Sequence, residues 1–258
     1  MIETIQLQEG ITLRCCNDDR FKTSCLSLQI VRPMCRQEAA ANALISAVLL
    51  RGSRRYPDLR DITLRLDDLY GASVGSLVRQ VSDYQTTRFY CSFAQERYAM
   101  AGDAILEPML DFVKELLLHP RMENGGFCAD YVEGEKRNLL SAVEAQKNDK
   151  RAYAAAQLNK YMCAADPSGV PRLGEPEQIR KLEPVSLYDH YRRILKQSRI
   201  DLFYVGSGDP RQVAALLMPL FESIDRSYVN LPPQTAFRSG DGGDHVETMD
   251  VEIGRTHV

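Results

Sequence analysis

Apolar and polar residues alternate near the start of the chain, from Ile11 to Cys15 and again from Ser24 to Val31. Alternation with a period of two places every second side chain on the same face of a β-strand. The two runs flank a short polar stretch, residues 17–20. Together they predict a β-hairpin.

From Gln37 onward, apolar residues recur at intervals of three and four, which collects them on one face of an α-helix. Gly52 is a residue type that commonly ends such a helix. A second helix is expected from Asp58 to Leu69. Beyond it, the runs 73–81 and 86–93 flank a turn-prone Ser-Asp pair and predict an antiparallel pair of strands.

The rest of the chain is expected to be mostly helical. The pattern predicts one further strand, 200–205, and helices at 104–118, 128–162, 185–195 and 210–224. Strands and helices therefore do not alternate regularly, as a doubly wound parallel fold requires. We expect an α+β fold, with a mainly antiparallel sheet and helices packed on one face.

Composition narrows the class of protein. The chain has 258 residues, 44% hydrophobic and 26% charged, which is typical of a globular protein. A net charge of −3 with interspersed signs provides no field to attract nucleic acid or an anionic membrane. We expect neither a membrane span nor a signal peptide. The seven cysteines include no C-x-x-C pair, which favours reduced thiols in a cytoplasmic protein, each buried as a small apolar residue.

Candidate chemistry is sparse. The four histidines, His119, His190, His245 and His257, lack the spacing of zinc ligands. His119 is expected at a helix end, near the last carbonyls. A cysteine nucleophile is an open alternative, with Cys128 or Cys25 acting beside His119, although no partner signature accompanies either cysteine.

The order of these motifs resembles a family of zinc peptidases that includes insulin-degrading enzyme, pitrilysin and the mitochondrial processing peptidase. The resemblance is carried by residues 39–53, where an alanine-rich helix ends in Leu-Leu-Arg-Gly-Ser, and by residues 61–72, followed by two strands. In the family, the corresponding helix carries the inverted motif H-x-x-E-H. Alignment on Leu49–Ser53 places Ala43 and Ala47 at the two histidine positions and Ser46 at the glutamate position.

The resemblance implies that the zinc site is lost. Two histidines four residues apart share one helix face and hold one metal ion, while the glutamate between them activates water. Alanine has no lone pair to donate. The family takes its third zinc ligand from a later helix, which 131–144 resembles, and the ligand position is Ala142. Glu144 replaces it only in a different register, so we expect no zinc and no other cofactor.

The resemblance extends through most of the chain, where 148–154, 174–176 and 188–191 are similar to a non-catalytic bacterial branch of the YfmF type. Family members contain two similar α+β halves joined by a linker. We therefore expect residues 1–231 to form one peptidase-like half and 232–245, rich in proline and glycine, to be the linker. Residues 246–258 then begin a second, truncated half, which makes the chain a fragment or an unusually short member.

The first functional hypothesis is a non-catalytic subunit that binds an extended peptide, a catalytic partner, or both. Members of the family add peptide to a sheet edge, and the resemblance assigns that edge to Gly75, Ser76, Leu77, Val78 and Arg79. The expected partner is a relative with an intact H-x-x-E-H. The second hypothesis is the cysteine hydrolase, and the third is an interaction module with no peptide role.

Overall fold

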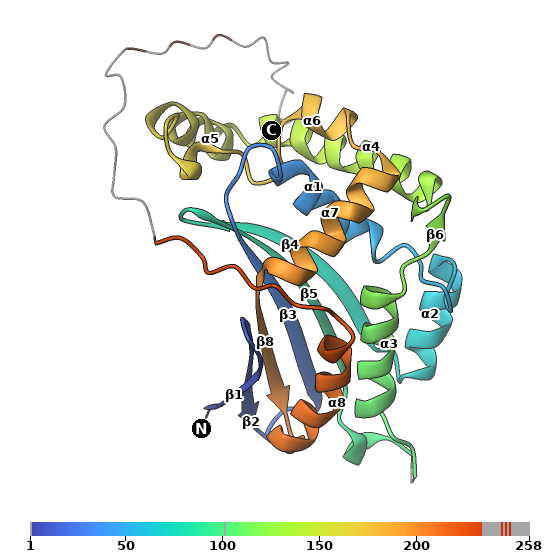
Figure 1. Cartoon of the computed structure of the whole chain (residues 1–258). Helices are drawn as coiled ribbons and strands as arrows, with labels where there is room; N and C mark the ends of the chain where they lie inside the picture. Colours follow the sequence, from blue (N-terminus) through green and yellow to red (C-terminus); the bar gives the residue numbers. More distant parts are fainter. Residues whose placement is uncertain (1, 101, 234–243, 245, 247, 249–258) are drawn as a thin grey trace, which may run out of the picture.

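A computed structural model describes residues 2–100, 102–233, 244, 246 and 248. Its centre is a six-stranded sheet in the order β1-β2-β8-β3-β5-β4 (Figure 1). The pairing of β2 with β8 is parallel and the other pairings are antiparallel. The mainly antiparallel α+β fold expected from the sequence is therefore confirmed. The strands are β1 (Ile2–Gln8), β2 (Ile11–Asn17), β3 (Thr23–Pro33), β4 (Ser73–Val81), β5 (Tyr84–Ala94) and β8 (Arg199–Gly206).

Helices cover one face of this sheet. Side chains alternate along β3, so that Leu26, Leu28 and Ile30 are buried in the main apolar core, whereas Cys25 is exposed on the opposite face. Val132 of α4 (Ala129–Ala145) and apolar residues of five further helices complete that core. These five helices are α1 (Ala39–Val48), α2 (Leu59–Asp68), α3 (Leu106–Leu118), α7 (Pro184–Gln197) and α8 (Pro210–Glu222). The opposite, more exposed face is called the open face below.

The expected hairpin between the first two alternating runs is wrong. Both runs are strands, but β8 lies between them, parallel to β2 and antiparallel to β3. The actual partner of β2 within the hairpin is β1, which the sequence interpretation missed. Alternation shows that a segment is half-buried in a sheet, but it carries no information on which strand lies beside it.

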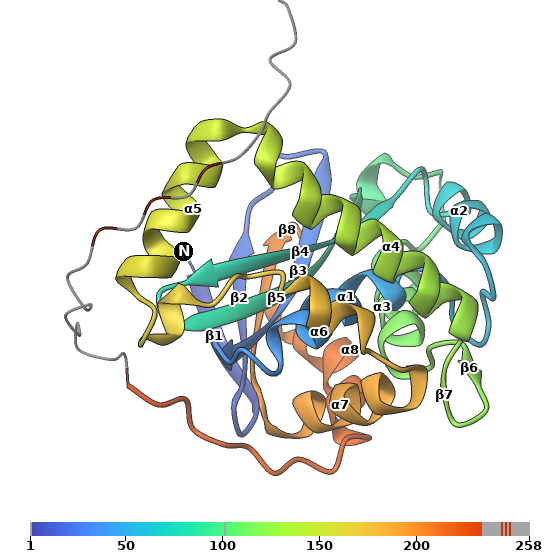
Figure 2. The ribbon, with the colours of Figure 1, turned by 90° about the horizontal axis from the view of Figure 1, so that it is seen from above.

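The helical region expected at 128–162 is two helices, α4 (Ala129–Ala145) and α5 (Lys150–Met162). A short 3-10 turn separates them, and Asp149 begins α5 by accepting a hydrogen bond from the amide of Ala152, 3.0 Å away. Figure 2 shows α4 crossing past β4, so that α5 lies on the other side of the sheet from α7 and α8. None of the α5 residues is buried.

Further short elements of the described fold include β6 (Met122–Glu123), β7 (Gly126–Phe127) and α6 (Pro176–Arg180). The expected linker at 232–245 and the start of a second half at 246–258 lie almost entirely outside the described residues, so this division of the chain stays a prediction. Among the residues that the structure describes, none of the helices is both long and apolar enough to cross a bilayer.

Candidate functional site

The positions that the resemblance assigns to the zinc motif lie on α1, between the sheet and α4. Ala43 is buried and Ala47 is half-buried. The hydroxyl of Ser46 donates a hydrogen bond to the carbonyl of Ala43, 2.9 Å away, and the side chain is only 3% exposed. Ser46 is therefore committed to its own helix, as serine commonly is there, and offers no base or free nucleophile.

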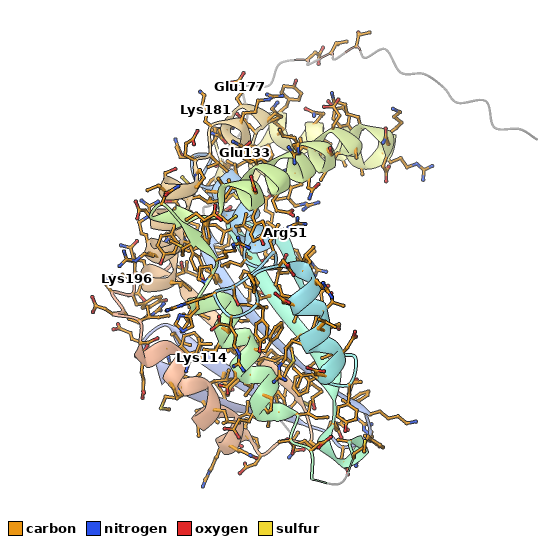
Figure 3. All side chains as sticks on the ribbon, turned by 90° about the vertical axis from the view of Figure 1, so that its right-hand side faces the viewer. Arg51, Lys114, Glu133, Glu177, Lys181 and Lys196 are labelled. Carbon is orange, nitrogen blue, oxygen red and sulfur yellow. The ribbon has the colours of Figure 1, made fainter. Side chains whose placement is uncertain are left out.

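The third ligand position that the resemblance implies lies on α4, which packs against α1. Arg51 Nη1 is 3.5 Å from Glu135 Oε1, and the same guanidinium lies over the ring of Tyr131 (Figure 3 shows Arg51 below α4). Ala142 is seven residues beyond Glu135, which returns to nearly the same helix face. Ala43 and Ala47 are four residues apart on α1 and therefore share one face of it. The three ligand positions that the resemblance implies thus all carry alanine.

The residues present do not fit a zinc ion. Glu144 is exposed and its carboxylate pairs at 2.9 Å with Lys147, which lies in the 3-10 turn after α4. Within the described part of the chain, no group of three histidine, cysteine, aspartate or glutamate side chains is placed to bind a metal. Zinc needs at least three such protein ligands in a catalytic site.

Beside α1 runs β4, the edge strand that contains Gly75, Ser76, Leu77, Val78 and Arg79. In the described residues β4 pairs only with β5, through a two-residue turn at Ser82 and Asp83. Such a hairpin closes with a hydrogen-bonded pair, here Val81 with Tyr84, and bonded pairs then recur at every second residue. The amide and carbonyl groups of 74, 76, 78 and 80 therefore point outward from the sheet.

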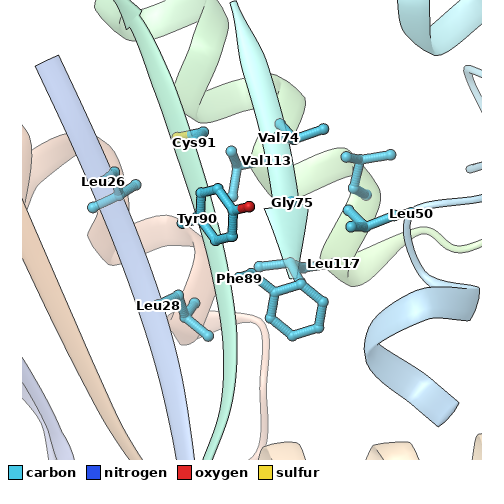
Figure 4. Close-up of a pocket in the computed structure, with 11 residues that line it drawn as sticks. Leu26, Leu28, Leu50, Val74, Gly75, Phe89, Tyr90, Cys91, Val113 and Leu117 are labelled. Atoms are coloured by element: carbon cyan, nitrogen blue, oxygen red, sulfur yellow. The ribbon is translucent and has the colours of Figure 1, made fainter. Parts of the chain in front are cut away.

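Gly75 leaves room for its neighbour on the open face. A Cβ at this position would lie 2.4 Å from the hydroxyl oxygen of Tyr90. Figure 4 shows the Tyr90 ring beside Gly75 on the adjacent strand. An aromatic ring packed over a strand glycine compensates for the missing side chain. The open face at this edge therefore presents an aromatic surface that is 42% exposed.

A narrow apolar cavity of about 20 Å³ lies nearby, between the sheet and α3. Its lining includes Leu28, Leu50, Phe89, Val113 and Leu117 (Figure 4). A space of this size holds one water molecule at most, and apolar walls leave such a molecule without partners. The cavity is a packing defect of the core and is unsuited to a ligand.

The proposed cysteine nucleophiles have the wrong environment. Burial raises the pKa of the Cys128 thiol, and partial burial raises that of Cys25, although Cys25 was expected to be buried and is exposed. His119 ends α3 as an exposed residue, and no hydrogen bond in the described structure joins it to either thiol. A catalytic cysteine needs a lowered pKa and a nearby base. Neither condition is met here.

One polar cluster was not identified from the sequence. His190 on α7 is 8% exposed, with its Nε2 atom 2.7 Å from Asn42 Oδ1 and its Nδ1 atom 2.7 Å from Arg193 Nη2. Because the guanidinium only donates, Nδ1 must accept, and Nε2 donates to Asn42. Asn42 donates in turn to Gln85 Oε1 at 2.8 Å. Burial lowers the pKa of His190 to about 4, against the opposing charge of Glu38. This network joins α7, α1 and β5 and is structural.

No family model matches the chain. It is 26% identical over 249 residues to a Bacillus subtilis (strain 168) protein named "Probable inactive metalloprotease YmfF". The match covers 96% of this chain and 58% of that protein, so the chain spans less than two thirds of its relative. From the motifs we expected a non-catalytic bacterial branch of the YfmF type, and this inactive relative is named YmfF.

Solved structures show the same fold. A conserved protein from Enterococcus faecalis V583 superimposes with a TM-score of 0.81 at 23% identity, over 94% of this chain and 54% of that one. An M16 peptidase inactive domain from Pseudomonas fluorescens gives 0.68 at 16%, over 91% and 54%. Pitrilysin gives 0.65 at 15%, over 91% and 24%. In sequence and in fold, this chain resembles the inactive branch of the insulinase and pitrilysin-like peptidases, as its motifs predict.

Proposed function

We propose that this chain is a cytoplasmic, non-catalytic subunit that holds an extended peptide for a catalytic partner. The observation that carries the proposal is the contrast between two neighbouring features. The metal positions Ala43, Ala47 and Ala142 have no ligand atoms, whereas β4 beside them keeps outward-pointing backbone groups at a sheet edge. The first feature removes catalysis and the second preserves binding.

Peptide binding by strand addition needs main-chain donors and acceptors and no metal. The groups of Val74 and Ser76 meet this requirement, because neither makes a hydrogen bond outside the β4–β5 pair in the described residues. The relatives named as inactive support a non-catalytic, peptidase-like role for the same scaffold.

A partner follows from the missing chemistry. A chain that holds peptide without cutting it contributes to hydrolysis only when another chain provides the metal site. The partner that we propose is a relative with an intact H-x-x-E-H whose own half faces the open face and α5. Exclusion of bulk water between two such halves strengthens the polar contacts to the peptide. The free thiols of all seven cysteines support a reducing compartment for this assembly.

The test is reconstitution with a motif-bearing relative from the same source. Each chain alone and the equimolar mixture are analysed by light scattering and by cleavage of a quenched fluorescent peptide. We expect a heteromeric complex and cleavage only in the mixture. A complex without any peptide-dependent change in melting temperature would favour the interaction module instead, and thiol-sensitive cleavage by this chain alone would favour the cysteine hydrolase.

A further inference from the structure

The edge of β4 is not uniformly available. The side chain of Arg172, in the loop before α6, donates from Nη1 to the outward carbonyl of Val78 at 3.2 Å. Gln85 fixes that loop by donating to the carbonyl of Arg172 at 2.6 Å. The carbonyl of Val78 is thus already hydrogen-bonded within the chain itself.

The same loop also covers the end of the strand. Gln80 Nε2 donates to the carbonyl of Ser168 at 2.7 Å, and Asn159 on α5 donates to that carbonyl at the same distance. The main-chain groups of Val74 and Ser76 and the amide of Val78 remain free. Those of Gln80 lie beside the loop that its side chain contacts, so the accessible edge runs from Val74 to Val78. At about 3.3 Å per residue, this length of edge accommodates a strand of about five residues.

Side chains of an added strand alternate between the two faces of the sheet. Towards the helices, they lie beside Val74, Ser76 and Val78, where the surface is largely covered and Val78 is 8% exposed. Towards the open face, they lie beside Gly75, Leu77 and Arg79. An added strand is therefore expected to direct small apolar side chains to the first face and longer ones to the open face.

The open face is cationic. The strand pairings place four arginines on it, against a single aspartate, Asp201, which is paired with two of them: Arg14 at 3.0 Å and Arg199 at 2.9 Å. The other two have no carboxylate partner in the described residues. Arg88 donates to the neutral amide of Gln29 at 2.8 Å, and Arg79 is exposed on the edge strand itself.

From this arrangement we infer that the edge selects a short, acidic, extended segment, about five residues long, with glutamate or aspartate side chains on the open face. The inference rests on the proposed function, because it names the peptide that the same edge holds. Arg79 lies nearest to such a carboxylate, and Arg88, one strand further in, adds to the potential within the screening length of physiological salt.

The experiment uses the full chain and three capped, fluorescein-labelled pentapeptides, Val-Xaa-Val-Xaa-Val, in which Xaa is Glu, Thr or Lys. Fluorescence anisotropy is measured at low and at high salt. We expect the Glu peptide to bind about tenfold more tightly than the Lys peptide, with a preference that decreases as salt screens the charges. The doubly substituted variant Arg79→Gln, Arg88→Gln should lose the preference, and Arg60→Gln, which removes an exposed charge on α2, should keep it.

Ser76→Pro separates the inference from the proposed function. It removes an outward amide without affecting the hydrogen bonds to β5, so the sheet tolerates it, whereas Ser76→Ala keeps that amide. Equal binding of all three peptides, lost in Ser76→Pro, would overturn the acidic preference and leave the proposed function standing. Binding of none of them would overturn both. An acidic preference that survives Ser76→Pro would place the peptide elsewhere and reject the inference.

Arg172→Ala tests the length limit. Freeing the carbonyl of Val78 should let a nonapeptide with the same Val-Glu alternation gain at least a few-fold in affinity over the pentapeptide, whereas the unaltered chain binds both alike. An unaltered chain that already prefers the nonapeptide would show that Arg172 does not limit the strand.

Discussion

His190 Nε2 lies 2.7 Å from Asn42 Oδ1, and this contact ties α7 to α1 with an uncharged histidine. Its pKa of about 4 is below the ordinary value of 6.5, so the unfolded chain binds the proton more readily at intermediate pH. The contribution of His190 to the free energy of unfolding is therefore fully present above pH 6.5 and is lost as the pH falls towards 4. We expect a loss on the order of 3 kcal/mol across this window, measured by urea unfolding at several pH values.

Other groups near the ring set the lower limit of that window. Glu38 is partly buried, which opposes ionisation, but the hydrogen bond and charge of Arg32 lower its pKa below 4.5. Its contribution to stability is lost only below that value. Between pH 6.5 and 5, the change in the free energy of unfolding with pH thus reports on His190. The variant His190→Gln should reduce that change. An unchanged pH dependence in that variant would contradict the assignment.

Restoring the zinc ligands tests the reading of the degenerate site. Ala43→His, Ser46→Glu and Ala47→His together should bind zinc weakly, because the third ligand is missing. Adding Ala142→Glu should tighten binding by at least tenfold in calorimetric titration. The cost is overpacking at Ala43, which is 4% exposed, and we expect a loss of about 1–3 kcal/mol in stability. Equally tight binding by the triple variant would implicate Glu144 or another carboxylate.

The cavity beside α3 offers a stabilising change. Val113→Ile adds one methyl group next to the space of about 20 Å³ and should raise the free energy of unfolding by about 0.5–1 kcal/mol. Val185→Ile adds the same group on α7, at a side chain that is 48% exposed, and should have little effect. A loss of stability in Val113→Ile would mean that the surrounding side chains already fill the cavity.

Thiol reactivity should follow burial. In the native protein, an aromatic disulfide reagent should modify exposed Cys25 before buried Cys91, whose pKa burial raises to about 12. Cys25→Ser should remove the fast phase and leave the fold intact. Cleavage by the reconstituted mixture should persist after Cys25 is alkylated, since no catalytic thiol is involved. Loss of cleavage on alkylation of Cys25, but not in Cys25→Ser, would indicate only steric obstruction of the open face.

The sequence predicted local elements well because each is determined by nearby residues. The strands that became β4 and β5, and the helix that became α2, were expected within a few residues of their observed bounds. Strand neighbours were not predictable, since β8 enters the sheet from a distant part of the chain. The edge strand β1 was missed because its first residues, 2–4, are exposed and only its second half alternates between apolar and polar residues.

The site was predictable only in part. The three alanine positions came from motif order, and the structure places them on α1 and α4 without testing their ancestral role. Neither the clamp of Arg172 on Val78 nor the network around His190 leaves a periodic signal. Each joins residues that are far apart in sequence through single side chains, and hydrophobic periodicity is insensitive to such contacts.

The position of β8 also bears on how the chain folds during synthesis. Arg14 and Asp201, which lie on neighbouring strands, are 187 positions apart. At about 5–20 residues per second, the ribosome needs on the order of ten seconds or more to complete the interval. During that time the edges of β2 and β3 that β8 later fills remain unpaired, and such edges are templates for wrong partners. This chain should therefore depend on chaperones during synthesis more than its size alone implies.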